Sequence, residues 1–151
     1  MQLSLHADYS LRVLLYLGSH PNETVTTRTI SLAYGISKHH LVRVVQTLAE
    51  AGYVALLPGR NGGIRLAMDP EEIRIGDVVR RAEPNLTLLE CFDPATNTCP
   101  IISVCGLKGV LHVALRAFLA ELDKHTLGSL MTAQRQRKLS AAFVEFTGRA
   151  K

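Results

Sequence analysis

The sequence predicts a mainly α-helical protein with one small β-hairpin: a winged helix-turn-helix domain followed by a long dimerisation helix. Three observations support this prediction. Two helical segments meet at a short glycine-containing turn, a hairpin pattern follows them directly, and an uninterrupted apolar helical periodicity begins at residue 107. The 151 residues are 47% hydrophobic, which is typical of a folded globular chain.

We expect three parts: residues 1–84 form the winged helix-turn-helix domain with a connector helix, residues 85–106 form a cysteine loop, and residues 107–151 form the dimerisation helix and a C-terminal tail. The net charge is +4, and it is unevenly distributed. Residues 1–68 hold six Lys/Arg against three Asp/Glu, whereas residues 69–106 hold three against seven. A basic first half favours a polyanionic partner, although the excess is small.

The first helix is predicted over residues 5–19, because its apolar residues recur at helical spacing until His20-Pro21 ends the pattern. Asp8 and Arg12 stand four residues apart near its start. This spacing favours an intrahelical ion pair, and the N-terminal helix dipole favours the carboxylate of Asp8.

A helix-turn-helix is predicted next. Thr26 or Thr27 caps a helix that runs to Tyr34, and Gly35 ends it. Ser37 caps the following helix, which continues to residue 51. The inner face of this helix is apolar and contains Leu41, Val44, Val45 and Leu48.

A hairpin follows, with strands at residues 53–57 and 64–67 and a glycine-rich turn at 58–63. A helix-turn-helix followed by a hairpin is a winged helix. Its second helix enters the major groove of DNA, and its wing contacts the minor groove or a phosphate. The candidate DNA contacts are polar or basic side chains on these elements: Arg28, Ser37, Lys38, His39, His40, Arg43, Arg60, Asn61 and Arg65.

A connector helix is predicted over 75–82, and the long helix begins after the cysteine loop. The long helix carries one apolar stripe: Leu107, Val110, Leu111, Ala114, Leu115, Phe118, Leu119 and Leu122. Part of the stripe must pack on its own domain. Because a winged helix reads a palindrome as two copies, we expect the stripe to form a homodimer. Thr126 caps a short helix. A frayed helix is one interpretation of the tail from residue 133, whose structure the sequence leaves open.

All three cysteines, Cys91, Cys99 and Cys105, lie in one loop that prolines and asparagine interrupt. We expect this loop to fold back and bring its sulfurs together. Buried structural thiols, a zinc site and an iron–sulfur cluster are the three alternatives. Gaps of seven and five residues lack the close pairing usual for zinc, and Cys105 precedes a helix whose dipole favours a thiolate. The pattern therefore favours a cluster over zinc.

Nearly the whole chain resembles the family of winged-helix iron–sulfur transcriptional repressors that includes IscR and NsrR, and it is most similar to the nitric-oxide-sensing members. The resemblance rests on these segments taken together: Met1-Gln-Leu, Asp8-Tyr, Leu11-Arg12, Gly59–Leu66, Ile73–Val79, the three cysteines with Leu107-Lys108, Phe118–Asp123 and Thr126-Leu127.

The resemblance implies one iron–sulfur cluster per subunit, with 4Fe–4S favoured and 2Fe–2S possible. Cys91, Cys99 and Cys105 are the implied thiolate ligands, and Asp8 of the partner subunit is the implied fourth. Some family members use a His three residues after the last Cys, but this chain has Lys108 there. The first gap of seven residues is longer than the five common in the family.

The resemblance also implies the function of a nitric-oxide-sensing repressor that leaves palindromic operators of nitric-oxide detoxification genes when its cluster is lost or nitrosylated. The alternatives are an iron–sulfur or zinc/thiol redox regulator of other genes on the same fold. A metal-dependent enzyme would need an acid/base pair or a nucleophile beside the cysteines. Asp93 lies near the cysteines, but no acid/base partner or nucleophile stands out beside it, so we expect that the chain is not an enzyme. No export signal or membrane span is visible, which predicts a cytoplasmic protein.

Overall fold

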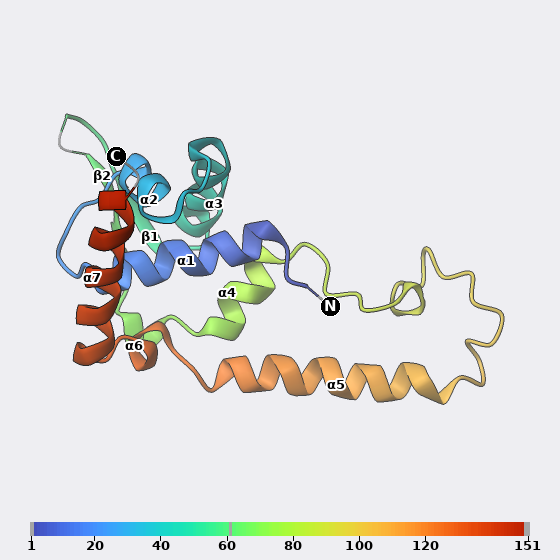
Figure 1. Cartoon of the computed structure of the whole chain (residues 1–151). Helices are drawn as coiled ribbons and strands as arrows, with labels where there is room; N and C mark the ends of the chain where they lie inside the picture. Colours follow the sequence, from blue (N-terminus) through green and yellow to red (C-terminus); the bar gives the residue numbers. More distant parts are fainter. Residues whose placement is uncertain (1, 61, 150–151) are drawn as a thin grey trace.

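The computed structural model describes residues 2–60 and 62–149 of the chain. Helix α1 (Leu5–Ser19) is central, and the remaining helices of the body pack around it (Figure 1). The hydroxyl of Ser4 caps α1 by accepting a hydrogen bond from the Ala7 amide. Val13 and Leu14 are fully buried, because this helix faces neighbours on several sides.

The helix-turn-helix consists of α2 (Thr27–Tyr34) and α3 (Lys38–Glu50). Thr26 caps α2, and Gly35 ends it with a φ of 64°, a left-handed conformation that glycine adopts without strain. The predicted inner face of α3 is confirmed, since its four apolar residues are all buried. The fold class predicted from the sequence is therefore correct for this half of the chain.

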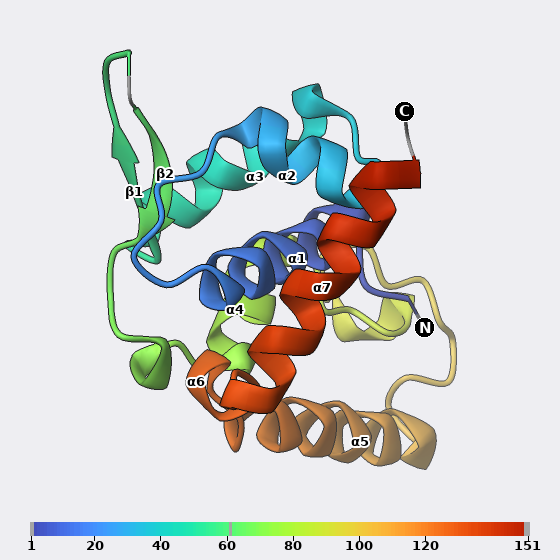
Figure 2. The ribbon, with the colours of Figure 1, turned by 60° about the vertical axis from the view of Figure 1, so that its left-hand side comes forward.

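The wing is an antiparallel pair of strands, β1 (Val54–Leu57) and β2 (Gly63–Leu66), which projects from the body (Figure 2). Strand β2 is attached to the α1–α2 connection, because Val25 and Ile64 exchange backbone hydrogen bonds of 3.0 and 2.7 Å. The predicted strands are confirmed to within one residue at each end. Asn61, a predicted DNA contact, lies outside the described residues.

A 3₁₀ turn (Pro70–Glu72) leads to the connector helix α4 (Ile75–Ala82), which has the predicted bounds. Helix α4 packs against both α1 and the long helix α5 (Gly106–Asp123). Arg80 on α4 forms a bidentate pair with Asp123 at the end of α5, at 2.7 and 2.6 Å. A side chain at Gly76 would collide with the Asp123 carboxylate, so glycine permits this contact.

Thr126 caps the short helix α6 (Leu127–Leu130) through a capping box with Ser129, as the sequence predicts. The sequence leaves the structure of the tail open, and the tail is more regular than a frayed helix. Residues Ala133–Arg149 form a regular helix, α7, that crosses α1 and α2 (Figure 2). Its side chains contact the end of α1: Gln136 Nε2 donates to the Gly18 carbonyl at 3.0 Å, and Ser140 Oγ donates to the Ser19 carbonyl at 3.3 Å.

Phe143 anchors α7 in an aromatic cluster and is only 9% exposed. Its ring centroid lies 4.8 Å from that of Tyr16 and 5.0 Å from that of Tyr34, the latter edge to face. Packing against the body, rather than helix propensity, therefore stabilises this polar segment. Tertiary packing of this kind has no strong local signature in the sequence.

Candidate DNA-binding surface and cysteine loop

The outer face of α3 presents the polar side chains that the sequence predicts. Lys38, His39, His40 and Arg43 are all exposed, at and near the N-terminal end of the helix. Ser37 at the N-cap is exposed, and its hydroxyl makes no capping hydrogen bond. These exposed side chains are therefore accessible to base edges or phosphates, and the His40 ring lies 6.2 Å from the ring of Tyr9.

The flanking basic residues extend this surface. Arg28 is exposed in the first turn of α2, and Arg65 is exposed on β2 opposite Ala55. Arg60 is exposed in the wing turn, directly after Gly59, whose φ of 97° allows the tight reversal. The described candidate contacts thus lie on the helix-turn-helix and the wing, the elements through which winged helices contact DNA.

The cysteine loop leaves the body after α4 and extends away from it before the chain returns as α5 (Figure 1). Cys91 lies in a short 3₁₀ turn (Glu90–Phe92) and is buried, whereas Cys99 and Cys105 are half-buried. Cys105 is the N-cap residue of α5. All three are free thiols, and thiolates are the usual ligands of iron–sulfur clusters.

The expected gathering of the three sulfurs does not occur in the single chain. Within residues 2–60 and 62–149, no three His, Cys, Asp or Glu side chains converge on a point where a metal ion could bind. The cited hydrogen bonds link residues between Glu90 and Cys99, so they do not fix the position of Cys105 relative to the other two cysteines. The donor set itself, three free thiols in one loop, fits a cluster chemically.

Asp8 forms the ion pair with Arg12 that the spacing predicts. Arg12 Nη2 lies 2.8 Å from Asp8 Oδ2, and Arg12 Nε donates to Asp8 Oδ1 at 3.0 Å. This hydrogen bond raises the pKa of Arg12 above its ordinary value. The guanidinium carbon lies 5.8 Å from the ring centroids of both Tyr9 and Tyr34. Asp8 is therefore connected through Arg12 to the helix-turn-helix.

Helix α5 has no buried residue, although it is the most regularly apolar helix of the sequence. Leu107 and Val110 are 57% and 65% exposed. Leu111, Leu115 and Phe118 line one side of a groove of about 470 Å³, and the N-terminal residues and Leu86–Leu89 line the other. The stripe therefore packs only partly on its own chain.

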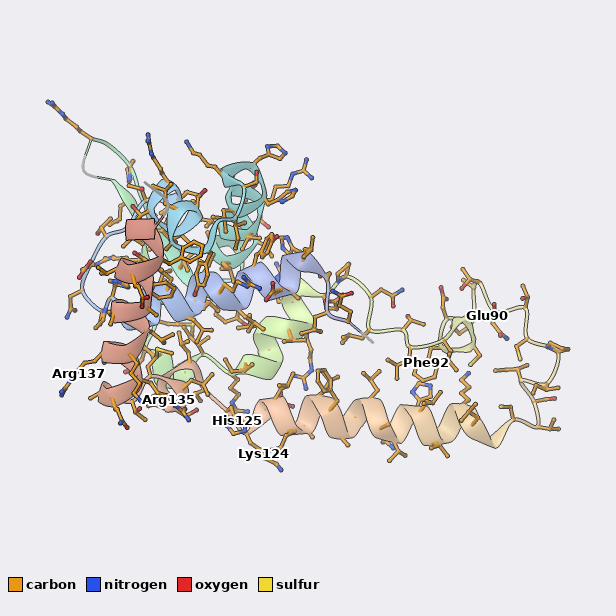
Figure 3. The ribbon with its side chains drawn as sticks, in the orientation of Figure 1. Glu90, Phe92, Lys124, His125, Arg135 and Arg137 are labelled. Carbon is orange, nitrogen blue, oxygen red and sulfur yellow. The ribbon has the colours of Figure 1, made fainter. Side chains whose placement is uncertain are left out.

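One interaction of the cysteine loop has no counterpart in the sequence prediction. The rings of Phe92 and His112 stack with centroids 4.0 Å apart and planes 2° apart, which holds the 3₁₀ turn of Cys91 against α5. Phe92 lies beside α5 in Figure 3. His112 lies on α5. This side chain is exposed but not free, and an aromatic residue beside Cys91 is the only sequence signal for the pair.

Together, the fold and the exposed basic surface define a winged helix-turn-helix DNA-binding protein. The family model of Rrf2, an iron-dependent transcriptional regulator, matches residues 3–133. The chain belongs to the Rrf2 family of transcriptional regulators, which confirms the predicted family and accords with the expectation that it is not an enzyme.

Individual relatives agree. The chain is 51% identical over 132 residues to the HTH-type transcriptional regulator NsrR of Bacillus subtilis, covering 87% of this chain and 90% of that protein. It is 50% identical over 133 residues to the regulator of the same name from Halalkalibacterium halodurans, covering 87% and 91%.

Solved structures share the fold. T. potens IscR matches with a TM-score of 0.70 at 23% identity, covering 87% of this chain and 86% of that chain. CymR, the global cysteine regulator of B. subtilis, matches with a TM-score of 0.66 at 25% identity, covering 87% and 96%. Among the described residues, none of the helices combines the length and apolar character needed to span a bilayer.

Proposed function

We propose that this chain represses transcription as a homodimer and leaves its operator when nitric oxide reaches an iron–sulfur cluster in the cysteine loop. One observation carries the proposal: every cysteine of the chain lies in the single loop that joins the DNA-binding body to α5. A change in this loop therefore acts on both elements at once. Relatives about half identical to this chain bear the name NsrR, which supports the same function.

The proposed ligands are Cys91, Cys99 and Cys105 of one subunit and Asp8 of the partner subunit. Three thiolates and one carboxylate would hold one cluster per subunit, with 4Fe–4S favoured over 2Fe–2S. Nitric oxide attack on iron is the chemistry that such a group supplies when bound. Because oxygen binds iron less firmly than sulfur does, a carboxylate ligand is the bond most easily lost.

The homodimer is supported by the exposure of α5. An 18-residue helix with a continuous apolar stripe and no buried residue loses stabilisation unless a second surface covers it. A second copy of α5 has the same stripe, so a two-fold interface is self-complementary. Two winged helices would then address the two halves of a palindromic operator.

The Asp8–Arg12 pair provides the coupling in this proposal. A carboxylate of Asp8 that ligates the partner's cluster is no longer available to Arg12 in the geometry of the ion pair. Arg12 is flanked by Tyr9 and Tyr34, and Tyr34 belongs to α2. Ligation and release at Asp8 would therefore bias the position of the helix-turn-helix between two states.

We propose that the operators control nitric-oxide detoxification genes and that the protein acts in the cytoplasm. The test is purification without oxygen, followed by iron and sulfide analysis and a visible spectrum. A brown protein with stoichiometric iron and sulfide supports the proposal, whereas a colourless zinc protein supports the thiol-regulator alternative. DNA duplexes selected from a random pool by the loaded protein then serve as operators. Nitric oxide should release them, and retention of DNA would contradict the proposed signal.

A further inference from the structure

The segment from Glu90 to Cys99 is held together by its own side chains. Glu90 Oε1 accepts two hydrogen bonds from Thr98, one from the backbone amide and one from the hydroxyl, both at 3.0 Å. Asp93 accepts from the Ala95 amide at 2.9 Å and from the Thr96 hydroxyl at 3.1 Å. These four hydrogen bonds all join residues of the segment to one another.

The Glu90–Thr98 contact differs from the others in its span. The Asp93 bonds cross two or three residues and shape a local turn, whereas the Glu90 bonds cross eight residues and close the loop. Cys91 directly follows Glu90, and Cys99 directly follows Thr98. The contact therefore joins the two chain positions next to the first two sulfurs.

A second side chain, Asn97, contacts the chain directly at Cys99. Asn97 Oδ1 accepts a hydrogen bond from the Cys99 amide at 3.1 Å, which orients the backbone that carries the second sulfur. On the other side, the Phe92–His112 stack attaches the turn of Cys91 to α5. Because Cys105 occupies the N-cap position of α5, this stack also links the turn of the first sulfur to the helix that begins at the third.

We propose that Glu90 is a positioning residue, whose carboxylate closes the loop between Cys91 and Cys99 before any metal is bound. Seven residues separate the two cysteines, and a flexible loop of that length pays a closure entropy each time its ends meet. A contact made within the protein removes part of this cost from the binding step. The identity of the bound group rests on the proposed function, but the closure itself does not.

The length of the Glu90 side chain and its negative charge can be tested separately. Glu90 is exposed, and its distance from Thr98 is set by the length of its side chain. Glu90→Asp keeps the negative charge and shortens the side chain by one methylene, so it breaks the contact. Glu90→Gln keeps the length and an accepting carbonyl oxygen but removes the charge. If the charge of Glu90 acted on the neighbouring thiols instead, Glu90→Gln would have the larger effect and Glu90→Asp the smaller.

The experiment uses the full-length, metal-free chain with Cys105→Ser, so that only Cys91 and Cys99 can pair. Equilibration with reduced and oxidised glutathione gives the effective concentration of one thiol at the other. Glu90→Asp is expected to lower this value about fivefold, the effect of losing about one net hydrogen bond. Glu90→Gln is expected to stay within about twofold of the parent, because its accepting oxygen is retained.

Glu72→Asp is the matched control, because it makes the same change at an exposed acid in the 3₁₀ turn before α4. An unchanged or higher effective concentration in Glu90→Asp, or a loss confined to Glu90→Gln, would overturn the proposal. Iron and sulfide uptake by the chain with all three cysteines is measured separately. If no cluster forms, the proposed function fails, while the thiol equilibrium still decides the role of Glu90.

Discussion

The hydroxyl of Tyr34 on α2 donates a hydrogen bond of 3.0 Å to the backbone carbonyl of Arg12 on α1. Burial raises the pKa of Tyr34, so its phenol stays protonated and able to donate. The same Arg12 holds Asp8 through its guanidinium. One residue therefore contacts the proposed cluster ligand with its side chain and the helix-turn-helix with its backbone.

Asp8→Ala tests whether Asp8 is only half of an ion pair. The two side chains are 38% and 41% exposed, so losing the pair should cost only about 0.3–0.5 kcal/mol of unfolding free energy. If Asp8 of the partner subunit is also a ligand, the visible circular dichroism of the anaerobically loaded protein should change, and nitric oxide should release the operator at a different dose. Asp77→Ala, which removes a comparable surface acid on α4, is the control. Identical spectra and identical release in the parent and in Asp8→Ala would show that Asp8 serves only as the ion-pair partner of Arg12.

Leu115→Glu or Leu119→Glu should produce monomers with weak operator binding, because a charge in the centre of the α5 stripe cannot be desolvated at low cost. Sedimentation of the purified protein gives the oligomeric state. Ala120→Glu places the same charge on the opposite, exposed side of α5 and should leave the assembly unchanged. A stripe variant that remains dimeric would remove α5 from the interface.

Arg43→Ala and Arg60→Ala should weaken operator binding in different ways. An arginine that binds a phosphate contributes to every DNA sequence alike, so its removal weakens binding uniformly and reduces the salt slope by about one. An arginine that binds a base edge instead sets the preference at one position of the half-site, and its removal relaxes specificity there. Arg135→Ala is the control, since that cation lies at the start of α7, away from α3 (Figure 3). Unchanged affinity and slope in both variants would exclude this surface.

The Arg80–Asp123 pair between α4 and α5 predicts a pH dependence. Hydrogen bonding from Arg80 lowers the pKa of Asp123 below its ordinary value. A group whose pKa is depressed by folding stabilises the folded state above its unfolded pKa, and this stabilisation disappears as the pH falls through the folded pKa. Asp123→Asn should therefore lower the Tm at pH 7, and its Tm should converge with that of the parent in strong acid. A constant difference in Tm across this range would contradict the assignment.

Phe143→Ala should lower the free energy of unfolding by about 3 kcal/mol, because it removes a buried aromatic ring and leaves a cavity beside Tyr16 and Tyr34. Urea denaturation followed by circular dichroism measures the change. Val144→Ala is the neighbouring control, since Val144 is 72% exposed. A decrease similar to that of the control would show that α7 is not anchored through Phe143.

Local chemistry explains why most helices could be predicted. Gly35 and Thr126 mark the helix boundaries that their residue types favour, and the apolar spacing of α3 identifies its buried face. The exposure of Lys38 and Arg43 follows from the same spacing, because they lie on the face of α3 opposite its apolar stripe. These features depend on neighbours within four residues, so one sequence is sufficient to find them.

The remaining features depend on partners far apart in the chain. Arg80 and Asp123 are 43 residues apart, and Gln136 and Gly18 are 118 apart. The Phe92–His112 stack joins a loop to a helix that have no common periodicity. Such pairs are fixed by how the elements pack, and the sequence on its own does not reveal that packing.

The position of α7 has a consequence for the order in which the protein can form during synthesis. The matched family segment ends at residue 133, where α7 begins, yet α7 covers part of α1, which is synthesised first. The aromatic cluster around Tyr16 can therefore close only after Phe143, which follows it in the chain, has been synthesised. A chain on the ribosome that lacks α7 would therefore hold an incomplete DNA-binding body, which is completed only after α7 has been made.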